Sequence, residues 1–139
     1  MTGCVLCDVH ARAELVVAQT ARWSLHAFKE RFPAGTLLLS AREHRTLAEI
    51  DTGSWAEAAP LIAKGTDLLY RVRRADKVYV CSFGEVLEHV HVVFLPKQPG
   101  DEAAHGGKRA AALFEALSDA GAADASEVLA WAARYRGAL

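Results

Sequence analysis

Residues 88–96 read Glu-His-Val-His-Val-Val-Phe-Leu-Pro, an apolar, β-branched run with two histidines near its start. Side chains of a strand point alternately to its two faces, so His89 and His91 are expected on the same face. Val90, Val92 and Phe94 are expected on the opposite face, which has the composition of an ordinary core face. Imidazole can serve near neutral pH as a metal ligand, a base or a nucleophile. The histidine pair therefore predicts a metal, a reactive partner or both.

The rest of the chain predicts an α+β domain. Short apolar runs predict strands at residues 15–20, 23–28, 36–40, 77–83 and 89–95. Capping-box patterns at 46–49 and 54–57 predict a short helix and then the longest helix, ending near residue 74. A loop is expected at 100–107, followed by an alanine-rich helical tail that restarts at 124–127. Because neighbouring strands have short connections, we expect a mainly antiparallel sheet in a single domain covering residues 1–139.

The composition limits the classes of function. The chain is 52% hydrophobic and 24% charged, as is typical of a globular protein. Its net charge of -1 gives no general attraction to nucleic acid or to an anionic membrane. No apolar run has the length of a bilayer span, and the N-terminus does not have the pattern of a signal peptide. We therefore expect a cytoplasmic protein with no nucleic-acid or membrane partner. In that reducing compartment, the three cysteines are not expected to form a disulfide framework.

Cys4 and Cys7 have the spacing of one half of a tetrahedral zinc site. His44, just after a predicted strand, and His89 are the best candidates for the other half. Four protein ligands would make such a zinc structural rather than catalytic. Two alternatives stay open: an incidental or redox-active CxxC, and a His44 that is only hydrogen-bonded. A thioredoxin-like CxxC is expected after a strand, and no strand is predicted before Cys4.

These motifs together resemble the histidine-triad (HIT) superfamily, whose strand motif is His-φ-His-φ-His-φ-φ, where φ is apolar. Many members begin with a CxxC and carry a segment Gly-His-x-Leu-Val-Ile-Pro-Lys-x-His, to which residues 35–44 are similar in position and spacing. Residues 95–97, Leu-Pro-Lys, look like the usual end of the strand motif. The resemblance implies a HIT-like fold with a mainly antiparallel five-stranded sheet, one long helix and a C-terminal helical segment. It also implies a homodimer that meets through the long helix and an edge strand.

The resemblance further implies a set of zinc ligands. In zinc-bearing relatives, including the related galactose-1-phosphate uridylyltransferases, the CxxC pair joins one histidine of the middle segment and the first histidine of the strand motif. The corresponding residues here are Cys4, Cys7, His44 and His89.

The nucleophile of the family corresponds to His91, which would attack the α-phosphate of a nucleotide conjugate and form a nucleotidyl-imidazole. Neutral imidazole is a good nucleophile near pH 7. Backbone N–H groups of the turn formed by Gly84, Glu85 and Val86 are expected to hold phosphate oxygens, because stabilisation of charge dominates phosphoryl transfer.

Two family histidines are substituted in this chain. The third histidine of the strand motif is Val93, and the histidine of the Gly-His pair is Thr36. Losing one acid or one donor typically costs about 100- to 1,000-fold in rate. Three histidines without an assigned role are candidates to substitute for them: His10, His26 and His105.

Three functions follow from these observations. The first is a nucleotide-binding hydrolase or nucleotidyl transferase that acts through His91. The alternative is a non-catalytic, zinc-stabilised module that binds a nucleotide or a protein. The third is thiol redox chemistry at Cys4 and Cys7.

Overall fold

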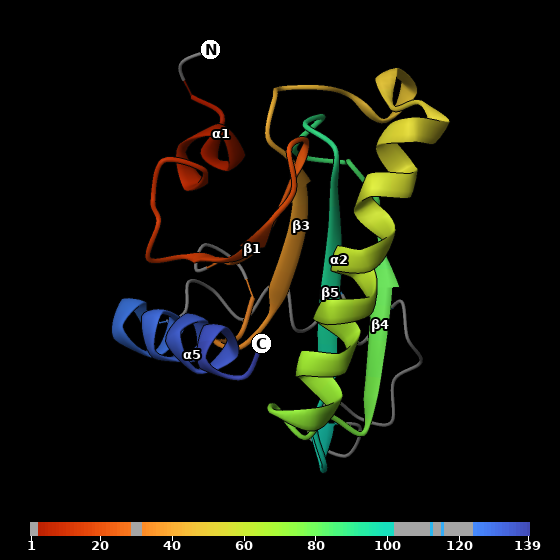
Figure 1. Ribbon diagram of the computed structural model, residues 1–139. Helices are drawn as coiled ribbons and strands as arrows, with labels where there is room; N and C mark the ends of the chain where they lie inside the picture. The colour runs from red at the N-terminus through yellow and green to blue at the C-terminus, as the bar shows by residue number, and fades with distance from the viewer. Residues whose placement is uncertain (1–2, 29–31, 102–111, 113–114, 116–123) are drawn as a thin grey trace.

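The computed structural model describes residues 3–28, 32–101, 112, 115 and 124–139. Its centre is a five-stranded antiparallel sheet with the strand order β1-β2-β3-β5-β4 (Figure 1). The strands are β1 (Val16–Gln19), β2 (Trp23–Ala27), β3 (Leu37–Ala41), β4 (Lys77–Cys81) and β5 (His91–Lys97). The helices are α1 (Val5–Val9), the 3-10 helix η1 (Leu47–Glu49), α2 (Thr52–Arg71) and α5 (Ala125–Gly137). This architecture confirms the α+β class and the antiparallel sheet.

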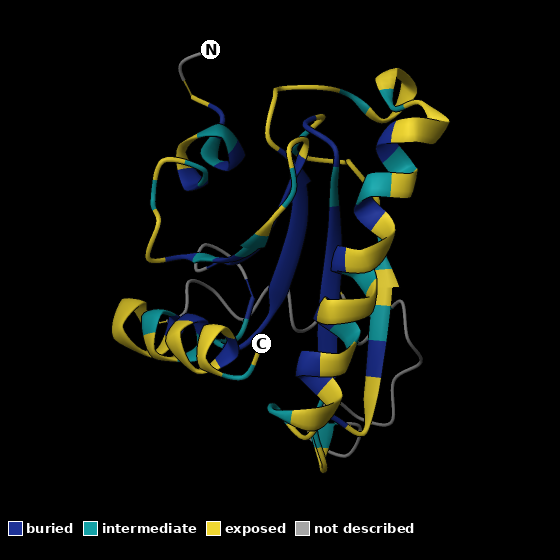
Figure 2. Cartoon of the chain, in the orientation of Figure 1, coloured by how far each residue is buried: buried dark blue, intermediate teal, exposed yellow. Residues whose placement is uncertain are grey.

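Both faces of the sheet are covered. On one face, Leu25 and Phe94 pack in a cluster with Leu61 and Leu68 of α2. On the other face, alternate strand residues pack with apolar side chains of α1 and α5, namely Leu38, Val93 and Leu95 with Leu6, Val9, Val128 and Ala132. The central strands are accordingly buried throughout (Figure 2). Among the described helices, none is both long and apolar enough to cross a membrane.

The start of α2 differs from the prediction. The N-cap is Asp51, whose carboxylate accepts the Ser54 N–H at 2.7 Å, so the helix begins at Thr52. The capping box expected at 54–57 is therefore wrong, because the earlier carboxylate already satisfies a free amide of the first turn. The helix also ends at Arg71 rather than near residue 74, where Arg74 has a φ of 61°. The prediction for 46–49 is confirmed: Thr46 N–H donates to Glu49 Oε2 at 2.7 Å at the start of η1.

The strand that carries the histidines begins two residues later than predicted. β5 starts at His91, and His89 lies in a bend just before it. Val90 N–H donates to the carbonyl of Arg45 at 2.7 Å, in the loop after β3, while the Val90 carbonyl accepts the N–H of Ala41 at 3.3 Å. β4 likewise ends at Cys81 rather than at residue 83. Helix α5 begins after the N-cap Asp124, as predicted, whereas most of the 100–107 loop and the first part of the alanine-rich tail lie outside the described residues.

Candidate metal centre and active site

Two cysteines and two histidines from three separate segments converge beside α1. Cys7 belongs to α1, and Cys4 is its N-cap. The ligand atoms of Cys4, Cys7, His44 and His89 all lie within 4.8 Å of one another. The structure therefore brings together the same four residues that the sequence suggested as zinc ligands.

Three sulfur–nitrogen separations in this cluster fit a tetrahedral zinc ion. Zn–S bonds of about 2.3 Å and Zn–N bonds of about 2.0–2.1 Å place neighbouring ligand atoms about 3.3–3.8 Å apart. His89 Nδ1 lies 3.3 Å from Cys4 Sγ and 3.5 Å from Cys7 Sγ, and His44 Nδ1 lies 3.4 Å from Cys7 Sγ. Two thiolates and two imidazoles are also a common donor set of closed zinc sites.

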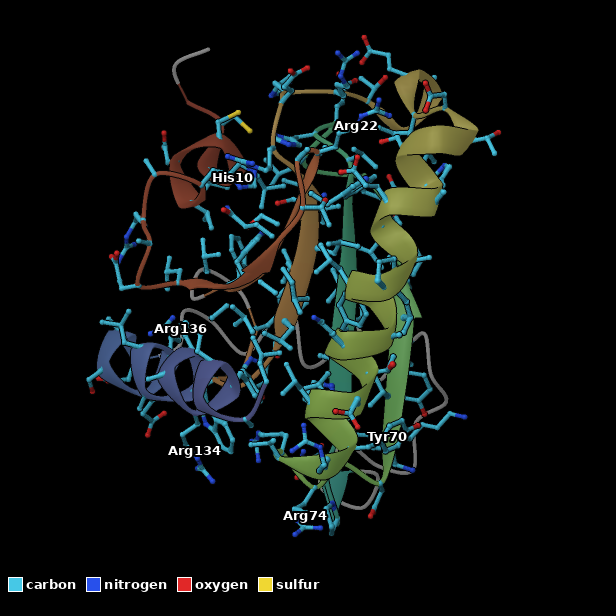
Figure 3. All side chains as sticks on the ribbon, viewed as in Figure 1. His10, Arg22, Tyr70, Arg74, Arg134 and Arg136 are labelled. Carbon is cyan, nitrogen blue, oxygen red and sulfur yellow. The ribbon has the colours of Figure 1, made fainter. Side chains whose placement is uncertain are left out.

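The backbone carbonyl of Ala41 sets the orientation of His89. It accepts hydrogen bonds from His89 Nε2 at 2.7 Å and from His10 Nε2 at 2.9 Å. Because a carbonyl can only accept, both Nε2 atoms carry the proton, and His89 Nδ1 keeps its lone pair facing the sulfur atoms. Such a second hydrogen bond is the usual way in which a protein orients a histidine ligand. Figure 3 shows His10 between α1 and the sheet.

Burial disfavours charge on the cluster itself. Desolvation, followed by the neighbouring Cys4 thiol, raises the pKa of Cys7. Desolvation also lowers the pKa of His89, while its hydrogen bond to Ala41 acts in the opposite direction. A cation offsets the cost of deprotonating the thiols, so metal binding and thiolate formation are expected to occur together.

His91 lies next to the cluster, at the first position of β5. It is half-buried, and its cross-strand partner in β3 is Ser40. Its Nδ1 donates to the carbonyl oxygen of His89 at 2.8 Å. This bond places the proton on Nδ1 and leaves the lone pair on Nε2. His91 thus has the tautomer that a nucleophilic imidazole needs.

A second pair of polar groups lies on this face: His26, one of the three histidines named as candidates to substitute for the missing ones, and Ser40, which was not predicted as part of the site. His26 Nδ1 donates to the carbonyl of Ala27 at 2.9 Å, so His26 Nε2 accepts the hydroxyl proton of Ser40 at 2.8 Å. Both side chains are fully buried, and burial is the main reason why the pKa of His26 falls to about 4. The register pairs Ser40 with His91 and His26 with Leu38. Since Leu38 and Ser40 are two residues apart in β3, their side chains share one face of the sheet, and His26 lies on that face with His91. The alternation of side chains along the strands could therefore have predicted this placement.

The remaining predicted positions are placed as follows. Gly84, Glu85 and Val86 are exposed in the connection between β4 and β5, and Gly84 has a φ of 69°. Val93 is buried in the core opposite Leu38, so its side chain is a packing group. Thr36 precedes β3 by one residue and lies about 13 Å along the strand from Ser40.

No protein-family model matches the sequence, and no curated protein matches it. The fold, by contrast, is similar to several solved structures. A hypothetical histidine triad nucleotide-binding protein of Sulfolobus tokodaii superposes with a TM-score of 0.73 at 17% identity, over 96% of this chain and 90% of that one. A Zn-bound histidine triad family protein of Mycobacterium smegmatis gives 0.70 at 15% identity, over 98% and 92%. A Hit-like protein of Bartonella henselae, described as involved in cell-cycle regulation, gives 0.69 at 17% identity, over 90% and 86%.

Proposed function

We propose that this chain, which has the fold of the histidine triad proteins, binds a nucleotide conjugate and acts on its α-phosphate through His91. The reaction class is that of a nucleotide hydrolase or nucleotidyl transferase. The observation that carries the proposal is the hydrogen bond of 2.8 Å from His91 Nδ1 to the His89 carbonyl, because it leaves Nε2 unprotonated. A structural neighbour described as nucleotide-binding supports the substrate class.

The proposed reaction has two displacement steps at phosphorus. His91 Nε2 forms a bond to the α-phosphorus while the bond to the leaving group breaks, and the leaving group takes up a proton from solvent. Water or a second substrate then displaces the imidazole and releases the nucleotide. We assign the phosphate oxygens to the backbone N–H groups of Gly84, Glu85 and Val86, since donors aimed at the developing charge stabilise such a transition state.

We further propose that Cys4, Cys7, His44 and His89 hold a structural zinc ion. The donor set and the separations of 3.3–3.5 Å fit this metal, and the fold is shared with a Zn-bound histidine triad protein. With four protein ligands, the ion would join α1 to the end of β3 and to the start of β5, and it would leave no open coordination position for catalysis.

Two observations favour the alternative function, a zinc-stabilised module that binds without turnover. Val93 occupies the position of the third histidine of the motif, and its buried side chain donates no hydrogen bond. The hydroxyl of Ser40, which lies opposite His91, gives its proton to His26. The proposed site therefore has fewer donors for phosphate than a complete triad.

One experiment distinguishes the two functions. Purified protein is incubated with adenosine 5′-phosphoramidate or diadenosine triphosphate, and the intact mass and the released nucleoside monophosphate are measured. The catalytic proposal expects an adduct of one nucleotidyl group that is absent in His91→Ala and present in Lys64→Gln, a control on the exposed side of α2. A rise in melting temperature without adduct or product would establish the binding module. Absence of both the rise and the product would exclude a nucleotide function.

We also propose a homodimer that meets through α2 and β4. β4 is an edge strand of the sheet, and Tyr70 and Val80 are 45% and 44% exposed on these two elements. Exposed edge strands are ready to pair with another chain. The cytoplasmic location stays a prediction.

A further inference from the structure

Two arginines meet one tryptophan at the end of the sheet that lies away from the metal cluster. The guanidinium carbons of Arg73 and Arg134 lie 4.6 Å and 4.2 Å from the centroid of the Trp131 ring. Arg73 follows α2, whereas Trp131 and Arg134 belong to α5. In Figure 3, Arg134 lies on the lower side of α5, and His10 lies at the opposite end of the view. This cluster is thus separate from the site at His91.

The backbone of Gly35 lies close to the side chain of Arg73. Gly35 has a φ of 94°, and a Cβ atom there would lie 2.6 Å from Arg73 Nε. Tyr135 of α5 donates to the Gly35 carbonyl at 2.6 Å, which holds this turn against α5. Gly35 therefore leaves room for the Arg73 side chain, which would have to shift if a Cβ atom were added at this position.

Among the described residues, no carboxylate forms an ion pair with either arginine of this cluster. Arg73 Nε is buried and has no acceptor among the described residues. The ion pairs formed within the described part of the chain involve neither Arg73 nor Arg134. A buried donor without an acceptor is costly, and an arginine held by an aromatic ring has its planar fork already oriented.

A hollow of about 420 Å³ opens beside these side chains. Its charged lining consists of Arg73, Arg134 and Glu127, and its apolar wall includes Pro33 and Trp131. Two cations against one carboxylate leave a net positive charge in the hollow. A doubly charged oxyanion matches two guanidinium groups better than a carboxylate does, since each fork can bind two oxygens.

We infer that the hollow between Arg73 and Arg134 binds the phosphate group of a small phosphomonoester. The guanidinium groups hold the phosphate oxygens, and Pro33 and Trp131 provide an apolar wall for the esterified part. This site does not depend on the function proposed for His91, because it shares no residue with that site.

NMR spectroscopy tests this inference at the site itself. The Arg73 Nε–H and Trp131 indole N–H resonances are followed during titration with phenyl phosphate, inorganic phosphate and acetate, and Trp131→Phe assigns the indole signal. We expect saturable shifts with both phosphates and tighter binding of the ester than of the free ion. Arg134→Gln should weaken binding about tenfold, as expected for the loss of a charge-assisted hydrogen bond. Lys64→Gln, which removes the same charge from an exposed position in α2, should leave it unchanged.

Three results would overturn the inference. The first is the absence of saturable shifts, which would show that the arginines only pack α5 onto the end of α2. The second is equal affinity in the wild type and in Arg134→Gln. The third is acetate binding as tight as that of phenyl phosphate. His91→Ala should not alter any of these titrations, so their outcome is separable from that of the nucleotide assay.

Discussion

His91 donates from Nδ1 to the backbone carbonyl of His89 at 2.8 Å, while the side chain of His89 lies 3.3 Å from Cys4 Sγ. One residue thus belongs to the candidate metal centre through its imidazole and sets the tautomer of the candidate nucleophile through its backbone. A change that moves the His89 backbone will also move the acceptor of His91. The metal centre and the nucleophile are therefore coupled through a single peptide group.

The metal centre is tested by removing one ligand. Cys7→Ala should lower the zinc content far below one ion per chain and destabilise the protein by about 4 kcal/mol or more, as is typical for the loss of a structural metal. Elemental analysis and urea denaturation measure the two effects. Cys81→Ala is the matched control, because Cys81 lies in β4 and not in the cluster. Equal zinc in both variants would contradict the assignment.

Restoring a histidine at position 93 should not rebuild a phosphate site. Val93 is buried between apolar neighbours in the core, so Val93→His should lower the free energy of unfolding by about 2 kcal/mol because a polar ring is buried without a partner. Urea denaturation measures this change. Leu47→His, at a position of η1 that is 57% exposed, should have an effect below about 0.5 kcal/mol. A Val93→His protein as stable as the wild type and faster with nucleotide conjugates would show that this position does face the substrate.

His26 should make the protein less stable in mild acid. The unfolded chain takes up a proton on this imidazole below its ordinary pKa of 6.5, whereas the folded protein does so only near a pKa of about 4. Stability is therefore complete above pH 6.5 and falls between pH 6.5 and 4, by about 3 kcal/mol in total.

Urea denaturation at several pH values measures this fall. In His26→Gln, which keeps a polar group near Ser40, the decline should be shallower than in the wild type. An identical decline in both proteins would assign the acid sensitivity to other groups.

Gly35 should resist substitution for two reasons. Its φ of 94° is unfavourable for other residues, and a Cβ atom would lie 2.6 Å from Arg73 Nε. We expect Gly35→Ala to destabilise the protein by about 1–3 kcal/mol in thermal or urea denaturation. Gly137→Ala serves as a control, because nothing lies within 4 Å of a Cβ atom at that position in α5. A loss of the same size in both variants would argue against a special role of the turn at Gly35.

The proposed dimer is tested at the edge strand. Val80→Lys places a charge on the exposed face of β4, where burial against a second copy would be costly. Sedimentation equilibrium should show a dimer for the wild type and a monomer for this variant. Leu47→Lys, at another exposed apolar position, should leave the dimer intact. A wild-type monomer at high protein concentration would exclude the interface.

Local patterns in the chain were sufficient for most of the fold. The alternation around β5 and the apolar runs of β2 and β3 indicated buried strands. The spacing of Cys4 and Cys7 indicated a metal site. Boundaries were less accurate where two signals competed. Asp51 capped α2 before the predicted capping box could, and β5 began only at His91, after the residue whose N–H bonds to the Arg45 carbonyl. The bond from Val90 to Arg45 connects residues far apart in the sequence, which no local window contains, whereas the cap at Asp51 spans only three residues.

Residue type, spacing and periodicity were thus enough to identify the antiparallel α+β architecture and the four candidate ligands, because these properties are carried by neighbours along the chain. Packing in three dimensions decided the rest. It turned both His89 and His10 towards the Ala41 carbonyl, gave His91 its tautomer, and enclosed Arg73 between Gly35 and Trp131. The bond from His91 to the His89 carbonyl spans only two residues and depends on the backbone bend at His89. The other arrangements join groups that lie far apart in the sequence, and only the folded chain brings those groups together.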